Sequence, residues 1–170
     1  MKGWQQGQRG SYGDDRDGQP SQRGGVVLGS RHYTRQLALQ ALYALDANPA
    51  LTVEESLFAV RAESGDAFSR ADHERLTTLV EGVHKDIERI DDAVEAASRN
   101  WKLPRMDRVD RSILRLGTFE LTGLVDVPAP VILSEAVELA KDFGSTESPA
   151  FINGILDRVA RNSRPDEVKT

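Results

Sequence analysis

The sequence predicts an all-α protein, a single helical domain of about seven helices that follows a disordered N-terminal tail. From Arg31 onward, apolar residues recur every three or four positions, which is the period of helices buried on one face. No segment alternates apolar and polar residues over the length of a strand. A chain of 170 residues is enough for one ordinary domain and leaves little for a second.

Residues 1–30 are predicted to form the disordered tail. They hold eight of the 14 glycines and few apolar residues, so burial cannot offset the entropy cost of ordering them. Their four basic and three acidic residues give this segment a net charge of +1. The net charge of the whole chain is −5, so the other residues carry about −6. The predicted organisation is therefore a tail over 1–30, a helical domain over 31–163 and a C-terminal tail over 164–170.

Turn and capping residues delimit the first two helices. The first helix ends at Asn48-Pro49. Thr52 is predicted to cap the second helix, because Glu55 stands three residues further on and completes a capping box. Ser64-Gly65 ends that helix. The apolar face of the first helix consists of Leu37, Ala38, Ala41, Leu42 and Leu45.

A long third helix is expected to begin at Asp72 as its N-cap. A short helix follows, with its start at Asp91-Asp92, and Trp101 and Pro104 separate it from the next helix. The apolar stripe of the third helix consists of Leu76, Leu79, Val80, Val83, Ile87 and Ile90. The stripe of the helix after Pro104 consists of Met106, Val109, Ile113, Leu116 and Leu121.

A loop over residues 123–130 precedes the last two helices. Pro130 suits the first turn of a helix over 131–143, and Gly144 suits its C-cap. Ser148-Pro149 is expected to be the cap and first turn of the last helix. Gly154 lies in the middle of that helix, where it costs roughly 1 kcal/mol relative to alanine. We therefore expect a neighbouring helix to approach closely there.

The composition argues against an enzyme. The chain has no cysteine, its three histidines lack metal-site spacing, and no phosphate-binding or nucleophile motif occurs. No catalytic residue, cofactor or metal is therefore predicted. Neither a signal peptide nor a membrane span of about 18 apolar residues is present, so a cytoplasmic protein without a membrane partner is expected.

Two groups of basic residues suggest binding to a polyanion. Arg31 and Arg35 are four residues apart at the start of the first helix and are expected to face the same way, with Tyr33 between them. Basic residues oppose the helix dipole at this end, which favours a binding role over a role in helix stability. Arginine and tyrosine can both stack on unpaired bases.

The second group covers residues 99–115, where six basic and two acidic side chains give +4. Arginines at 105, 108, 111 and 115 form a ridge on one helical face. Asp107 is placed to pair with Arg111 one turn away. Ion pairs with other helices and contact with a ligand are equally open explanations of this ridge.

Four segments of the chain resemble one protein family. In order they are RHYTRQLALQALYALD, LPRMDRVDRSILRLGTFEL, VPAPVILSEAVELAKDFG and SPAFINGILDRVAR, which together cover about residues 31–161. They resemble the bacterial transcription antitermination factor NusB. The resemblance implies a fold of two packed helical halves, without catalysis. It also implies binding to the boxA element of nascent rRNA together with NusE, a ribosomal small-subunit protein, in the antitermination complex of RNA polymerase.

The resemblance also implies site residues. Arg31 and Arg35 fall in the family's N-terminal arginine-rich RNA-binding motif, in which family members often have more arginines. Residues matching the family's RNA surface are Phe143, Glu147 and Phe151. Asp110 matches the surface that meets NusE, and Tyr43 is a second candidate there. Both phenylalanines also fit the apolar stripes of their own helices.

Two other functions fit some of these features. An RNA-recognition domain of an rRNA methyltransferase would need a catalytic domain downstream, and the chain ends at Thr170 without one. A helical protein–protein adaptor, with weak or no RNA binding, is consistent with the small number of arginines in the motif. Some relatives form homodimers that would bury the RNA surface, so a homodimer is an alternative assembly.

Overall fold

A computed structural model describes the backbone of residues 25–99 and 101–168, and side chains from Ser30 onward. The described part contains seven α-helices, one short 3₁₀ helix and no strand, which confirms the all-α prediction. In chain order, the α-helices are α2 (Gly25–Ala47), α3 (Val53–Ser64), α4 (Arg70–Lys85), α5 (Ile87–Ser98), α6 (Arg108–Gly123), α7 (Ala129–Phe143) and α8 (Ser148–Ser163). The 3₁₀ helix η1 (Leu103–Arg105) precedes α6.

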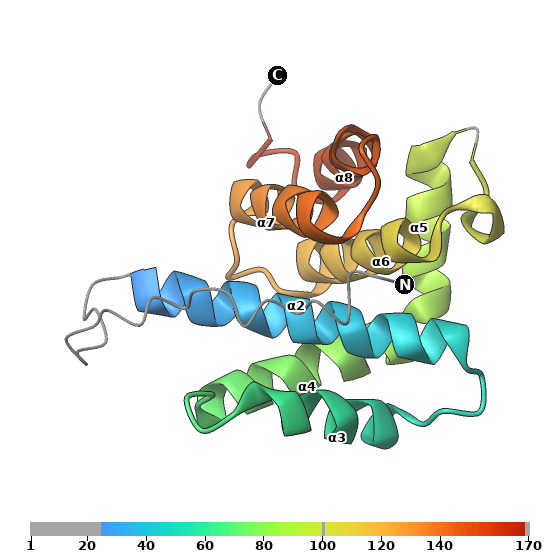
Figure 1. The fold of residues 1–170 in the computed structure, drawn as a ribbon. Coiled ribbons are helices and arrows are strands. Elements are labelled where there is room, and N and C mark those ends of the chain that lie inside the picture. Colours follow the sequence, from blue (N-terminus) through green and yellow to red (C-terminus); the bar gives the residue numbers. More distant parts are fainter. Residues whose placement is uncertain (1–24, 100, 169–170) are drawn as a thin grey trace.

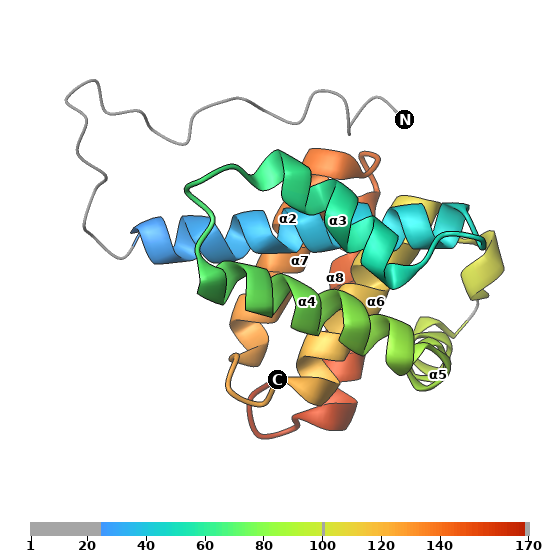
Figure 2. The same ribbon diagram turned by 90° about the horizontal axis from the view of Figure 1, so that it is seen from below.

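The helices pack in two groups, as the resemblance implied. Helices α2, α3 and α4 form one group, and α5, α6, α7 and α8 form the other (Figure 1). Helix α2 joins the two groups, because it contacts α4 of its own group and α6 of the other. In the view from below, α3 crosses in front of α2 and α4 runs alongside it (Figure 2). One continuous core runs through both groups, with Leu37, Leu76, Ile113, Leu139 and Ile152 among its fully buried side chains.

Reciprocal capping boxes fix the starts of α3 and α4. Thr52 accepts a hydrogen bond from the Glu55 backbone, and the Glu55 carboxylate accepts one from the Thr52 backbone, which confirms the predicted cap. The prediction for α4 is wrong, since its N-cap is Ser69 and Asp72 occupies the third helical position. Asp72 also accepts a hydrogen bond of 2.5 Å from the Ser30 hydroxyl, so this carboxylate joins α4 to α2.

The break between the third and fourth predicted helices lies earlier than expected. Asp86 ends α4 and begins α5, whereas Asp91 and Asp92 lie inside α5. The apolar stripe continues across Asp86 because Val83 and Ile90, on either side of the break, are both buried. Periodicity alone therefore could not locate the bend.

Close approach of helices occurs at two glycines other than the predicted one. A Cβ at Gly154 would meet no atom within 4 Å, so the expectation for that residue is wrong. At Gly82, in contrast, a Cβ would overlap the ring of Phe119. At Gly117 a Cβ would come within 2.7 Å of the Leu156 side chain. These contacts pack α6 against α4 and α8.

The last two helices begin one or two residues away from their predicted positions. Helix α7 begins at Ala129, with Pro130 in its first turn, and Gly144 is its C-cap as predicted. The N-cap of α8 is Glu147, not Ser148. Ser148 is buried in the first turn, where its hydroxyl accepts a hydrogen bond of 2.9 Å from the Ser145 backbone.

Described structure extends past the predicted bounds of the helical domain at both ends. Residues 1–24 of the predicted N-terminal tail lie outside the described part, but α2 already begins at Gly25. At the other end, Arg164 is buried and donates hydrogen bonds to backbone carbonyls of α6 and of the loop that follows it. The Glu167 carboxylate accepts a hydrogen bond of 2.8 Å from the Ala129 backbone, at the start of α7. The chain is therefore anchored beyond the predicted end of the domain.

Candidate nucleic-acid interface

The two arginines of the predicted RNA-binding motif have different environments. Arg31 is exposed, near the start of α2. Arg35 is only 5 % exposed, and its guanidinium binds both carboxylate oxygens of Glu120 on α6, at 2.8–3.1 Å. The expectation that both face the same way is wrong, because the carboxylate of Glu120, which is 3 % exposed, requires a buried counter-charge. Arg31 is thus the one of the two that a phosphate can reach.

His32 connects the start of α2 to α7. Its Nδ1 lies 2.6 Å from a carboxylate oxygen of Glu135, and its Nε2 lies 3.8 Å from Asp142. The hydrogen bond to Glu135 raises the pKa of His32 above 6.5, although burial and Arg35 act in the opposite direction. The same hydrogen bond lowers the pKa of Glu135. This ion pair fixes α7 next to the part of α2 that carries Arg31.

We expect the His32–Glu135 pair to make stability dependent on pH. Folding raises the pKa of His32, so the protonated side chain stabilises the folded state. This stabilisation is complete at pH values below the unfolded-state pKa of about 6.5. It is lost as the pH rises through the folded-state pKa. The lowered Glu135 pKa contributes above its unfolded value and is lost as pH falls. The difference in melting temperature between the parent and His32→Gln should therefore be largest near pH 6 and shrink by about pH 8.5.

Thermal unfolding followed by circular dichroism at several pH values checks this expectation. The matched control is His84→Gln, since His84 is exposed in the last turn of α4. Because the side chain is exposed, His84→Gln should change the melting temperature little. A difference for His32→Gln that stays constant from pH 5.5 to 8.5 would contradict the assignment of the ion pair.

The three residues of the predicted RNA surface lie around the turn between α7 and α8. Phe143 ends α7, Glu147 is the exposed N-cap of α8, and Phe151 is in the first turns of α8. Phe143 and Phe151 are half-buried and pack against the core, so each has a structural role and an exposed part. Phe151 also meets the indole of Trp101 edge to face, with ring centres 6.3 Å apart.

The two predicted partner-binding residues are partly engaged inside the protein. Tyr43 on α2 is half-buried, and the Arg108 guanidinium lies 5.8 Å from its ring centre. Asp110 is 8 % exposed, and its Oδ1 atom has no hydrogen-bond partner among the described residues. Burial raises the pKa of Asp110, while a hydrogen bond from the Ser148 hydroxyl lowers it. Asp110 thus joins α6 to the start of α8 rather than lying open on the surface.

Most of the arginine ridge is used in ion pairs within the protein. Arg108, Arg111 and Arg115 all contact Asp46 near the end of α2, at 2.5–3.2 Å. Arg115 also forms two hydrogen bonds with Asp91 on α5, at 2.8 and 2.9 Å. Burial pushes the Asp46 pKa upward, but the arginines outweigh it and hold that pKa below its ordinary value. The open question about the ridge is therefore settled for these three residues as internal pairing.

The proposed pair between Asp107 and Arg111 is wrong. The Asp107 side chain caps α6 by accepting a hydrogen bond of 2.9 Å from the Val109 backbone. Arg111 instead donates to the Leu103 carbonyl at 2.9 Å, in addition to its contact with Asp46. Arg105 is exposed and forms no ion pair with any described residue, so it is the member of the ridge that remains open to a ligand.

Sequence reasoning overlooked two residues that shape this region. Glu120 stands among the apolar residues of α6, and an acidic residue inside a buried stripe is a signal that a basic partner is needed. For Trp101, the sequence pattern indicates only a separator between two helices. It is 53 % exposed beside a small pocket, and a large aromatic side chain in a loop with several cations was the signal available for it.

Comparison with known proteins decides the family. The model of the NusB family matches residues 32–161, which is most of the chain. The chain belongs to the NusB family. The transcription antitermination protein NusB of Myxococcus xanthus is 48 % identical over 139 residues, covering 78 % of this chain and 96 % of the relative. The NusB protein of Sorangium cellulosum is 46 % identical over 135 residues, with coverages of 79 % and 94 %.

Solved NusB structures have the same fold. T. maritima NusB aligns with a TM-score of 0.73 and 31 % identity, over 81 % of this chain and 94 % of that one. A chain from the crystal structure of antitermination factors NusB and NusE in complex with double-stranded RNA aligns with a TM-score of 0.72 and 25 % identity. The alignment covers 79 % of this chain and 98 % of that chain.

The described residues contain neither a membrane-spanning helix nor a metal-binding cluster. None of the described helices is long and apolar enough to cross a membrane. No group of three or more histidine, aspartate or glutamate side chains in residues 30–99 and 101–168 is arranged to hold a metal ion. The remaining features of interest are the basic, aromatic and buried polar residues described above.

Proposed function

We propose that this NusB-family protein binds the boxA element of nascent rRNA together with NusE and acts in the antitermination complex of RNA polymerase, in the cytoplasm. The observation that carries the proposal is the fold match over 98 % of a chain solved with NusE and RNA, together with family membership over residues 32–161. Those two findings support a binding function, and none of the described clusters resembles catalytic machinery.

The acidic total charge is compatible with this function. Single-stranded RNA can be held by a few arginines and stacking aromatic residues without an overall basic protein. Arg31 is exposed in the second turn of α2, and α7, which ends at Phe143, is held beside it through His32. The proposed RNA surface consists of Arg31 and the turn between α7 and α8, including Phe143, Glu147 and Phe151. Arg35 supports this surface from inside through Glu120.

Arg31→Ala is expected to weaken binding to a boxA RNA and to leave the helical circular dichroism unchanged, because the side chain is exposed. Losing one phosphate contact should also lower the slope of log affinity against log salt by about 0.7 for a single strand. Fluorescence anisotropy with labelled RNA at several salt concentrations, with and without NusE, measures both quantities.

The matched control is Arg70→Ala. Arg70 is an exposed arginine in the first turn of α4, a helix that is not part of the proposed RNA surface. It should leave RNA affinity within twofold. If the parent protein binds NusE but no boxA RNA in any salt condition, the protein is an adaptor without RNA binding. Equal affinities of the parent and Arg31→Ala would remove Arg31 from the RNA surface.

The proposed NusE surface includes Tyr43 and Asp110 in two different roles. Tyr43 has an exposed part, next to Arg108, and is proposed to touch the partner directly. Asp110 is buried, so it is proposed to act by holding Ser148 and the start of α8 in position. This division of roles follows from the burial of the two side chains.

A further inference from the structure

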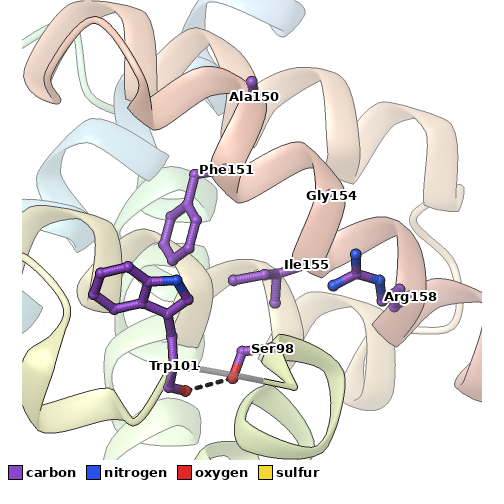
Figure 3. A pocket seen from close by; sticks show the side chains of 7 residues that line it. All are labelled: Ser98, Trp101, Ala150, Phe151, Gly154, Ile155 and Arg158. Atoms are coloured by element: carbon purple, nitrogen blue, oxygen red, sulfur yellow. Dashed lines mark hydrogen bonds between the residues drawn. The ribbon is translucent and has the colours of Figure 1, made fainter.

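A small pocket lies beside the proposed RNA surface. It has a volume of about 270 Å³ and lies between the end of α5, the loop that follows it, and α8. Its lining residues are Ser98, Trp101, Ala150, Phe151, Gly154, Ile155 and Arg158. Figure 3 shows the indole of Trp101 and the ring of Phe151 side by side at one end of the pocket, with Arg158 at the other. Gly154 keeps this wall open, since it has no side chain.

Trp101 is held in place while much of its ring stays exposed. The Ser98 hydroxyl donates a hydrogen bond of 2.5 Å to the Trp101 carbonyl, which fixes the backbone of the loop. The edge-to-face contact with Phe151 orients the indole. The side chain is nevertheless 53 % exposed, which leaves a large aromatic surface in water. A fixed and exposed aromatic ring beside a pocket is suited to stacking on a ligand.

Arg158 is the charged residue among those that line the pocket, and further basic residues stand in the chain segment that contains Trp101. Arg99, Lys102 and Arg105 are exposed, and none of them forms an ion pair with a described residue. Arg158 uses one guanidinium nitrogen to donate to the Ala97 carbonyl at 2.8 Å, so its other donors remain available. The nearby Glu95 carboxylate accepts a hydrogen bond of 3.4 Å from the Leu103 backbone. Arg158 is therefore the basic group of the pocket itself, and the other three cations belong to the adjoining chain segment over residues 99–105.

We propose that this pocket receives one base of single-stranded RNA, stacked on Trp101, with Arg158 at its polar end and Arg99, Lys102 and Arg105 next to the adjoining phosphates. The volume is below the roughly 300–1,000 Å³ of pockets that enclose drug-sized ligands, so it suits one ring system rather than a whole nucleotide. Stacking platforms combined with cations are the usual means of holding single strands. The inference rests on the proposed RNA-binding function and extends its surface from Phe151 to the loop before η1.

Intrinsic fluorescence can test this stacking directly. The chain has two tryptophans, Trp4 and Trp101, so Trp4→Phe leaves Trp101 as the single reporter. In this background, titration with a single-stranded boxA RNA should quench Trp101 fluorescence, with the same dissociation constant that anisotropy gives. RNA binding without any change in Trp101 fluorescence would overturn the proposal.

Substitutions then measure the contribution of the ring. Trp101→Ala should weaken RNA binding about tenfold, and Trp101→Phe should retain most of the affinity because it keeps an aromatic face. Phe58→Ala is the matched control, since Phe58 is 78 % exposed on α3 and lies outside the pocket. Lys102→Gln should lower the salt slope by about 0.7. Affinity of Trp101→Ala within twofold of the parent would overturn the proposal.

An RNA series with one abasic position at a time separates base stacking from a general structural effect. At one position, removing the base should weaken binding to the parent but not to Trp101→Ala. Equal losses of RNA affinity for the parent and Trp101→Ala at every abasic position would overturn the proposal. It would also be overturned if Trp101→Ala lost NusE binding but still bound RNA like the parent. If the parent itself binds no RNA, the proposed function fails, which is a result distinct from these.

Discussion

Replacing Arg35 with alanine is expected to lower the free energy of unfolding by about 3–5 kcal/mol, because it removes one partner of a buried ion pair. The side chains of Arg35 and Glu120 are 6 % and 4 % exposed, and they share a two-point hydrogen-bonded contact. Without the guanidinium, the Glu120 carboxylate would stay buried without its partner. Urea unfolding followed by circular dichroism would show the loss as a lower midpoint.

Arg31→Ala is the matched control for this prediction. Both residues belong to the same basic segment, but Arg31 is exposed, so its substitution should change stability by less than about 0.5 kcal/mol. A double variant, Arg35→Met with Glu120→Leu, should recover most of the stability, because replacing both partners of a buried pair with apolar groups is often neutral. Equal stability of Arg35→Ala and Arg31→Ala would contradict the structural role of Arg35.

This prediction also changes how RNA-binding data should be interpreted. A double substitution of both arginines would weaken RNA binding for two separate reasons, lost contact at Arg31 and lost stability through Arg35. The single variants separate these causes. Measuring affinity well below the unfolding transition of each variant keeps the two effects apart.

Arg164→Ala is expected to lower the free energy of unfolding by on the order of 3 kcal/mol. The charged side chain donates hydrogen bonds to several backbone carbonyls, and a hydrogen bond to a charged group contributes about 1.5–3 kcal/mol. The guanidinium donates to the carbonyls of Leu121 at 2.8 Å, Glu120 at 2.9 Å and Leu124 at 2.6 Å. It also donates to the Val127 carbonyl. These bonds tie the C-terminal residues to the end of α6 and the loop before α7, and their losses will not simply add.

Melting temperatures of Arg164→Ala and of a control variant at a nearby arginine, Arg161→Ala, test this prediction. Arg161→Ala removes only an exposed pair with Asp157, which is worth about 0.2–1 kcal/mol. For a domain of this size, 3 kcal/mol corresponds to a fall of roughly 6–12 °C. If Arg164→Ala and Arg161→Ala melt at the same temperature, the anchoring role of Arg164 is wrong.

Local signals in the sequence predicted most of the helices well. The Thr52 and Glu55 pair predicted a cap because a capping box depends only on residues three positions apart. The sequence predicted wrongly where two residues could each play the same role and only the packed structure determines which one does. Ser69 and Asp72 can each cap a helix, and only the backbone that forms determines which one does. Gly154 and Gly117 both lie inside helices, and only the position of the neighbouring helix shows which one is in close contact.

The candidate site divides in the same way. The sequence identified a basic segment in the first part of α2, but Arg35 differs from Arg31 through its buried ion pair with Glu120, which is 85 residues away along the chain. Similarly, the arginine ridge was evident from its spacing. Its pairing with Asp46 depends on the contact between α2 and α6.

The sequence by itself determined an all-α fold with its order of helices and its family, because helical periodicity and family motifs are written in consecutive residues. Tertiary structure alone decided which charges are available to a ligand. A charged side chain becomes structural when a distant partner joins it in the interior, as Glu120 does for Arg35. It stays open to a ligand when none of the described residues pairs with it, as with Arg31, Arg99 and Lys102.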